Sequence, residues 1–212
     1  MARTIKDNKN VIQSYTLTTS RYKFTAYEKR ILYRIVEYAQ DEIKGILIRD
    51  NLHRIEHSLF GREITMPVAD ILKDEQDENY TMAKKAFSSL SDKFIIIDND
   101  DIWQKTHIIS NPKIKKKTGM VTFSVFNEIW DGMLNFSKGY RKYELVTAMQ
   151  FNSVYSMRFY EILSGQKRPL EFTFEQLRKM LCVNDKYKLV GDFKRWVLDV
   201  AKKELDESSP YS

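Results

Sequence analysis

Hydrophobic positions between residues 25 and 40 recur with the period of an α-helix. Five apolar side chains would share one face of it, namely Ile31, Leu32, Ile35, Val36 and Ala39. Thr25 is a candidate N-cap residue, and Glu28 stands three positions later, which is the spacing of a capping box. Apolar residues at these intervals indicate a buried helix face. The segment therefore predicts an amphipathic helix from Thr25 to about Gln40.

Shorter elements follow this helix. Residues 63–66 predict a brief strand, and Pro67 stands where a short helix carrying Val68, Ile71 and Leu72 can begin. After an acidic loop at 73–79, residues 80–90 predict a second helix. Its inner face would hold Ala83, Ala86, Phe87 and Leu90, and its outer face Thr81, Lys84, Lys85 and Ser88. Residues 46–61 show no clean period, and we expect irregular or short helical structure there.

A lysine-rich hairpin is predicted next. Residues 94–97 have strand composition, 98–101 resemble a turn, and 103–110 and 120–126 predict two strands. The loop 111–119 would join these two strands and carries Lys113, Lys115, Lys116 and Lys117. A further helix is expected at 127–136. The order helix, strand, short helix, basic helix and hairpin is that of a winged helix-turn-helix.

The first predicted unit is weakly repeated later in the chain. A shift of 127 residues aligns Phe24 with Phe151 and residues 32–36 with 159–163. A short strand at 170–173, a short helix at 174–181 and a longer helix at 189–205 are expected to follow, in the order of the first unit. Since the sequence ends at Ser212, we expect the second unit to stop before its wing hairpin. The predicted fold is therefore α+β and helix-rich, with two tandem winged-helix domains at 1–148 and 149–212.

The amount and distribution of charge indicate what kind of partner the protein binds. Lysine and arginine exceed the acidic residues by six, 35 against 29. Residues 102–119 contain five lysines and no acid, whereas residues 70–78 contain five acids and one lysine. Because cationic side chains neutralise phosphates and release counterions, gathered lysines favour a nucleic-acid partner. The acidic segment is not expected to face DNA.

The second long helix offers candidate contacts to DNA bases. We expect Phe193, Trp196, Val197, Val200 and Leu205 to pack inward, which leaves Lys188, Lys194, Arg195 and Lys202 for DNA. Arg195 is the candidate base contact, because a guanidinium can donate two hydrogen bonds to guanine O6 and N7. In the first unit, the DNA backbone would be held by the outer face of the second helix and by the hairpin, through Thr81, Lys84, Lys85, Ser88, Lys113, Lys115, Lys116 and Lys117. The alternative is that all these charges are simply solvated.

Several kinds of chemistry lack their motifs. No G-x-x-x-x-G-K-[ST] segment is present for nucleotide phosphates. His107 has no second histidine two residues away, as a metal-dependent nucleophilic tyrosine would require. His53 and His57 could share a helix face as metal ligands, and Asp98, Asp100 and Asp101 suggest a calcium loop, but Ile109 occupies the position of its glutamate. We expect no enzyme activity, metal or cofactor.

The remaining composition indicates a cytoplasmic protein. The apolar runs are far shorter than the roughly 18 residues of a membrane span, and the basic start lacks the features of a secretory signal. Cys182, the only cysteine, stands between Leu181 and Val183 and is expected to be a small core residue. No membrane association is expected.

Three segments resemble the iteron-binding initiators of theta-replicating plasmids. They are residues 11–32 (VIQSYTLTTSRYKFTAYEKRIL), 154–163 (VYSMRFYEIL) and 172–205, which includes FTFEQLRKML and YKLVGDFKRWVLDVAKKEL. The resemblance implies two winged-helix domains, the first for dimerisation and backbone contact and the second for site recognition. It departs at the missing second wing and the long segment 46–61.

The resemblance leads to one main functional hypothesis. It is a sequence-specific initiator that binds direct repeats in double-stranded origin DNA and recruits host replication proteins such as a helicase or initiator. As a homodimer it would also repress its own gene. The alternatives are a winged-helix transcription regulator that binds a palindromic promoter site and a protein-interaction module whose charge serves solubility.

Overall fold

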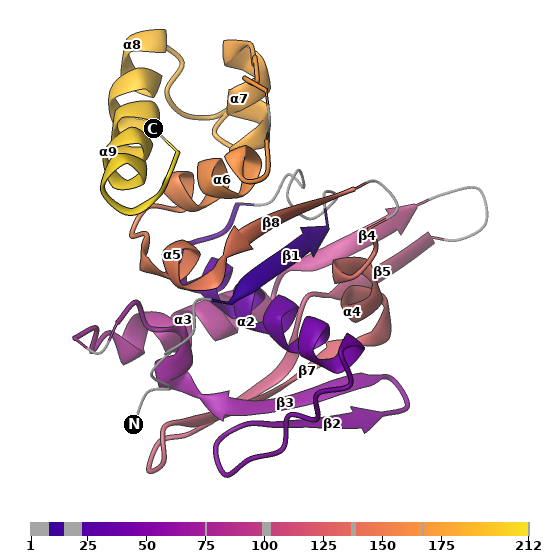
Figure 1. Ribbon diagram of the computed structural model, residues 1–212. Coiled ribbons are helices and arrows are strands. Elements are labelled where there is room, and N and C mark those ends of the chain that lie inside the picture. The colour runs from indigo at the N-terminus through magenta and orange to yellow at the C-terminus, as the bar shows by residue number, and fades with distance from the viewer. Residues whose placement is uncertain are drawn as a thin grey trace. The chain divides into compact units, whose positions relative to one another are not determined.

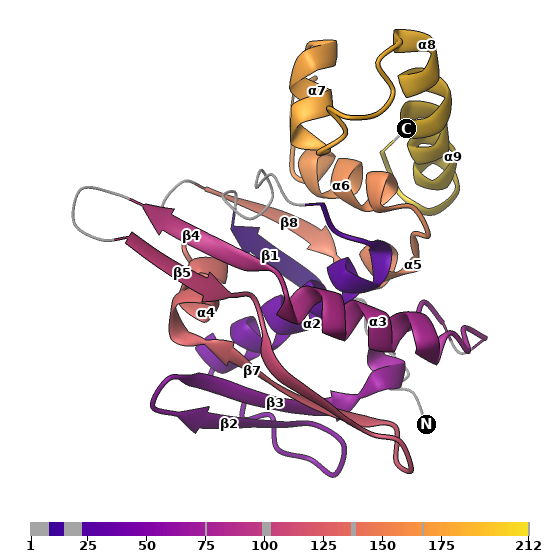
Figure 2. The same cartoon turned by 180° about the vertical axis from the view of Figure 1, so that it is seen from behind.

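The computed structural model describes residues 9–14, 23–74, 76–98, 103–136, 139–166 and 168–211 (Figures 1 and 2). They form two compact units. Among the described residues, unit 1 comprises 30–134, and unit 2 comprises 9–29 together with 135–211. The predicted domains, 1–148 and 149–212, remain a prediction. Over these ranges the structure has no helix of the length and apolar character needed to cross a membrane.

Unit 1 has a four-stranded antiparallel sheet in the order β2-β3-β7-β6 and a separate β4-β5 pair. Its helices and strands are α2 (Ala26–Ile43, from Arg30 onward), β2 (Arg54–Ser58), β3 (Gly61–Pro67), η1 (Val68–Ile71), α3 (Tyr80–Ser91), β4 (Phe94–Asp98), β5 (Trp103–His107), β6 (Ser110–Lys115), β7 (Met120–Phe126) and α4 (Asn127–Met133). Gly61 lies so close to the backbone of Val125 that a β-carbon would collide with it. Glycine therefore lets β3 and β7 meet.

The predicted first helix is present as α2 and begins as expected. The Thr25 amide donates to Glu28 Oε2 over 2.7 Å, and the Glu28 amide donates to Thr25 Oγ1 over 3.3 Å. This is the reciprocal capping box, which satisfies amides that no helical carbonyl can reach. The apolar positions of the helix are buried: Ile31, Leu32, Ile35, Val36 and Ala39.

Two predictions for unit 1 are wrong. Residues 46–61 are not merely irregular, since β2 forms there and pairs with β3. The hairpin also differs from its predicted form, because the segment 103–110 divides into β5, which pairs with β4, and the start of β6. The hairpin that projects from unit 1 is β6-β7. Lys113 and Lys115 lie within β6, and Lys116 and Lys117 form the turn.

Unit 2 joins distant parts of the chain. An antiparallel pair of strands connects residues near the start to residues past the middle. The elements are β1 (Asn10–Ser14), β8 (Tyr140–Glu144), α5 (Leu145–Gln150), α6 (Val154–Leu163), α7 (Phe174–Met180), α8 (Val190–Phe193), η2 (Lys194–Leu198) and α9 (Asp199–Ser208). The strand expected at 170–173 is absent from this described segment. Thr173 instead caps α7, in a capping box with Gln176.

One continuous helix from α8 to α9 contains a π-helical turn, η2. Its buried residues recur every four positions, at Phe193, Val197, Ala201 and Leu205. A π-turn holds more residues than an α-turn. A residue three positions after a buried one, such as Trp196 after Phe193, therefore no longer lies on the buried side of the helix. The prediction that Trp196 packs inward is therefore wrong, and half of its surface (50%) is exposed. Val200 is half-buried.

Unit 2 also contains a buried group of charges. Lys29 Nζ lies 2.5 Å from Glu161 Oε1, and Arg158 Nη1 lies 3.8 Å from Glu161 Oε2. All three side chains are buried. Burial and the charge of Arg158 lower the pKa of Lys29, against the opposing effect of Glu161. Burial and the charge of Glu161 raise the pKa of the neighbouring Tyr143.

Candidate nucleic-acid interface

The first candidate surface is the outer face of α3. Ala83, Ala86, Phe87 and Leu90 are buried, as the pattern predicts, and they hold the helix against unit 1. The opposite face exposes all four polar residues that the sequence singles out, namely Thr81, Lys84, Lys85 and Ser88. The helix therefore presents two hydroxyl groups and two cations to solvent. Such side chains bind phosphate oxygens.

A groove of about 540 Å³ lies between the start of α3 and the β6-β7 hairpin. Its lining comprises Val68, Tyr80, Thr81, Lys84, Ile114, Lys116, Thr118 and Gly119. The groove thus brings Thr81 and Lys84 together with Lys116, although these residues are far apart in the sequence. The chain turns sharply at Gly119, where φ is +66°, and the Gly119 carbonyl accepts the Val68 amide over 2.8 Å. That bond ties the hairpin to the start of η1.

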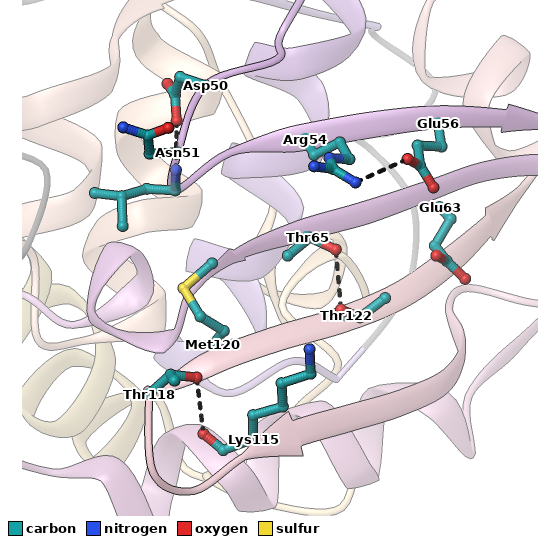
Figure 3. A pocket seen from close by; sticks show the side chains of 11 residues that line it. Asp50, Asn51, Arg54, Glu56, Glu63, Thr65, Lys115, Thr118, Met120 and Thr122 are labelled. Atoms are coloured by element: carbon teal, nitrogen blue, oxygen red, sulfur yellow. Dashed lines mark hydrogen bonds and ion pairs between the residues drawn. The ribbon is translucent and has the colours of Figure 1, made fainter.

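The other hairpin lysines do not line this groove. Lys113, Lys115 and Lys117 are exposed. Lys115 lies beside a second hollow of about 420 Å³, over the sheet (Figure 3). Asp50, Glu56 and Glu63 also line that hollow, and Glu56 accepts from Arg54 over 3.2 Å. Three carboxylates disfavour phosphate there, so the groove beside α3 is the better candidate for DNA.

Unit 2 has a helix-turn-helix formed by α7, a turn and the long helix. Leu181, Val183, Phe193 and Val197 make up its small core. The Phe174 ring meets Phe193 edge-on at 5.3 Å between ring centroids. These contacts fix α7 against the long helix, whose exposed side is left for a partner.

The turn between the helices is held by Arg178, which sequence reasoning missed. Its guanidinium donates to the carbonyls of Asn184 (2.6 Å) and Lys186 (3.3 Å) and to Glu175 Oε1 (3.2 Å). It also lies over the Phe174 ring at 5.3 Å. An arginine near the end of a helix is common in sequences and indicates no particular partner. The backbone of the turn decides which carbonyls it contacts.

Two residues in this segment adopt left-handed backbone conformations without being glycine. They are Cys182, with φ of 55°, and Tyr187, with φ of 49°. Side chains other than glycine rarely adopt this region, so the surrounding contacts must maintain it. Burial and a hydrogen bond with Tyr187 raise the pKa of Tyr155. Cys182 is half-buried beside a buried leucine and valine, close to the core role predicted for it.

The predicted cations of the long helix differ in their partners. Lys194 Nζ lies 2.7 Å from Asp199, and Lys202 Nζ lies 3.0 Å from Asp206, both in exposed pairs. Arg195 instead lies over the Trp196 ring, 4.9 Å from its centroid. Lys188 is exposed just before the helix begins. Exposed ion pairs contribute about 0–1 kcal/mol, so phosphate can replace either aspartate at little cost.

The metal-site hypotheses do not match the structure. His53 precedes β2 and His57 lies within it, so the two histidines do not share a helix face. His53 Nε2 lies 2.7 Å from Asp70, and its Nδ1 lies 3.2 Å from Asp50. In the part of the chain that the structure describes, no three His, Cys, Asp or Glu residues are grouped to hold a metal. Asp98 ends β4, and residues 100 and 101 lie outside the described residues.

The geometry first defines a class of protein. In unit 1, helix α2 is followed by strands β2 and β3, the short helix η1, helix α3, the β4-β5 pair and the projecting β6-β7 hairpin. Figure 2 labels α2, β3, α3 and β7 among them. This order is that of the winged helix-turn-helix, a class that binds DNA through its second helix and its loops. The helix-turn-helix in unit 2 supplies a second copy of the same motif.

The chain belongs to the family of initiator replication proteins. The family model described as "Initiator Replication protein, WH1" matches residues 10–164, and that described as "Initiator Rep protein, WH2" matches residues 173–212. Together they span most of the chain. The predicted family and its two winged-helix domains are therefore confirmed.

The fold is also similar to a solved structure, described as "Crystal structure of Pi initiator protein in complex with iteron DNA". The TM-score is 0.70, and the match covers 95% of this chain and 87% of that chain. The sequences are 16% identical, so the similarity concerns the fold. A comparison with curated proteins finds no match.

Proposed function

We propose that this initiator binds tandem direct repeats in plasmid origin DNA. The observation that carries the proposal is the pair of exposed DNA-binding motifs, a basic groove in unit 1 and a helix-turn-helix in unit 2, in a chain of the initiator family. The structural neighbour was crystallised with iteron DNA, which supports the same class of target. Repeated sites suit a protein that must assemble several copies at one origin.

The two motifs take different parts in this proposal. The groove residues Thr81, Lys84 and Lys116 bind phosphates, with Lys85 and the exposed hairpin lysines adding to the backbone contact. In unit 2 the long helix enters the major groove, where Arg195 recognises a guanine. Lysines bind any sequence, so site preference depends on unit 2.

The wider role extends to partners. Bound to its repeats, the protein recruits host replication proteins, such as a helicase or an initiator, in the cytoplasm. As a homodimer it represses its own gene. It acts by binding and carries out no reaction itself, in keeping with a sequence that has no nucleotide-binding motif.

Selection of sites from a randomised duplex library at near-physiological salt tests the proposal. We expect one enriched motif, bound more tightly in tandem direct repeats than as an inverted repeat. Arg195→Ala should weaken preference for one guanine by about 1–3 kcal/mol. Lys179→Ala, which removes an exposed charge from α7, is the control and should leave base preference unchanged.

Two results would contradict the proposal. Tighter binding to an inverted repeat would favour a transcription regulator that recognises a palindrome. An absence of duplex binding even at low salt would exclude both DNA-binding functions and favour a protein-interaction module.

A further inference from the structure

Trp196 is a large apolar residue that lies partly exposed on the long helix of unit 2. Half of its surface is exposed, whereas Phe193 and Val197 on either side of it are buried. The π-helical turn that contains Trp196 keeps these neighbours in the core and directs the indole outward. π-turns occur often at functional sites, and an exposed tryptophan is unfavourable in water. The position therefore suggests a use at the surface.

The exposed indole lies against the guanidinium of Arg195, which is 4.9 Å from the ring centroid. Nearby cations are held differently, since Lys194 and Lys202 face Asp199 and Asp206. In the described part of the chain, no carboxylate forms an ion pair with Arg195. An ion pair would occupy the N–H groups at the edge of the guanidinium. Stacking occupies only its flat face and leaves the edge donors available.

We propose that Trp196 is a positioning residue for base recognition, because it holds Arg195 with its N–H edge free to donate to O6 and N7 of a guanine. This inference rests on the proposed function and assigns the specificity of unit 2 to a pair of residues. An unsupported arginine loses rotamer freedom on binding, whereas a stacked one is already restricted. Trp196 should therefore improve discrimination at one guanine and add little at other positions.

The test uses the full chain and the duplex site that it selects. Guanines are replaced one at a time with 7-deazaguanine, which lacks the N7 acceptor but keeps base pairing. For the wild type we expect one position where the replacement weakens binding about tenfold, the loss of part of a two-bond contact. Arg195→Ala should remove this penalty and so identify the contacted guanine.

Trp196→Leu should weaken binding to the unmodified site about fivefold, the upper end of an exposed cation–π contact, leave binding to the modified site unchanged, and so reduce the penalty to about twofold. Trp196→Tyr keeps an aromatic face and should retain most of the penalty. Leu189→Ala removes another exposed apolar side chain (69% exposed) and is the control, with the penalty unchanged. Urea denaturation of each variant separates a loss of stability from a loss of guanine recognition.

The outcomes separate the inference from its premise. A full 7-deazaguanine penalty in Trp196→Leu would overturn the positioning role, even if that variant bound all sites more weakly or were less stable. If no guanine depended on Arg195, the base contact itself would be wrong, and the inference would fail with it. The proposal is supported if Arg195→Ala removes the penalty, Trp196→Leu removes most of it and Trp196→Tyr retains most of it.

Discussion

The two helix-turn-helix motifs of this chain offer cations to DNA in different ways. Unit 1 exposes six lysines on α3 and the β6-β7 hairpin, and within the described residues none of the six forms an ion pair. In unit 2, Lys194 and Lys202 face aspartates, and the arginine of the long helix lies on a tryptophan. One motif provides many exposed charges, and the other provides one oriented donor group.

This difference suggests how binding strength and selectivity are divided. A lysine ammonium acts as a point charge that binds phosphate in any sequence. A planar guanidinium has donors in a fixed arrangement that fits the edge of guanine. Strength should therefore come mainly from unit 1 and selectivity mainly from unit 2, so each can be changed without the other.

The largest effect is expected from Glu161→Gln, which removes the carboxylate that faces Lys29 and Arg158 inside unit 2. Breaking a buried ion pair leaves charge uncompensated, so the free energy of unfolding should fall by about 3–5 kcal/mol in urea denaturation. The variant should lose site preference while it keeps salt-dependent binding through unit 1.

The matched control for this change is Asp206→Asn. It breaks the exposed pair with Lys202 and should cost less than about 1 kcal/mol. A similar loss of stability in both variants would show that burial of the Glu161 cluster does not matter. Loss of all DNA binding by Glu161→Gln would contradict the division between the units.

The next largest effect is expected on binding strength, when all four hairpin lysines become alanine: Lys113, Lys115, Lys116 and Lys117. Fewer phosphate contacts should reduce the slope of log K against log salt by about 2–4, and affinity should fall about 100-fold near 0.1 M salt. Base preference should not change. Measurement of affinity against salt, for the selected site and a scrambled site, tests both statements.

Replacement of the same four residues by arginine is the control, because it preserves charge and should preserve the slope. A variant with four alanines that loses base preference but keeps its salt slope would reverse the roles of the two units.

The smallest effect concerns pH and unit 1 alone. Burial disfavours the charged form of His53, but the hydrogen bond with Asp70 and the charges of Asp70 and Asp50 outweigh it, so the pKa lies above the ordinary 6.5. The folded state then binds the proton more tightly than the unfolded state. This contribution to stability is complete below pH 6.5 and is lost as pH rises through the folded-state pKa.

Urea denaturation across this range should show stability falling with pH in the wild type. His53→Gln cannot titrate and should give a flatter curve. Equal slopes for the two proteins would mean that His53 does not carry the dependence. His57→Gln is the control, since that histidine is exposed and 3.9 Å from Glu42.

The sequence predicted elements whose residues interact locally. The capping box at Thr25 and Glu28 needs only neighbours in the chain, and so does the apolar face of α3. Strand β2 escaped prediction because its side chains are mostly exposed and its pairing with β3 gives it order. Residues 170–173, which the structure describes, form no strand, although their composition favours one. In the described part of the chain no other strand pairs with them.

The candidate site shows the same limit. Exposure of Lys84, Lys116 and Arg195 follows from local pattern, but the groove that joins Lys84 to Lys116 depends on how α3 packs against the hairpin. Arg178 could not be assigned to the turn, because its acceptors are backbone carbonyls whose direction no sequence pattern records.

By itself the sequence determined the family, the main helices and the gathering of positive charge, since these depend on residue type and short spacing. Only the tertiary structure decided that Trp196 leaves the core. A single π-turn changes the side on which every later side chain lies, and its cost is repaid only by the packing of Phe193 and Val197. The contact between Arg195 and the Trp196 ring therefore follows from how the helix packs, and the sequence pattern does not predict it.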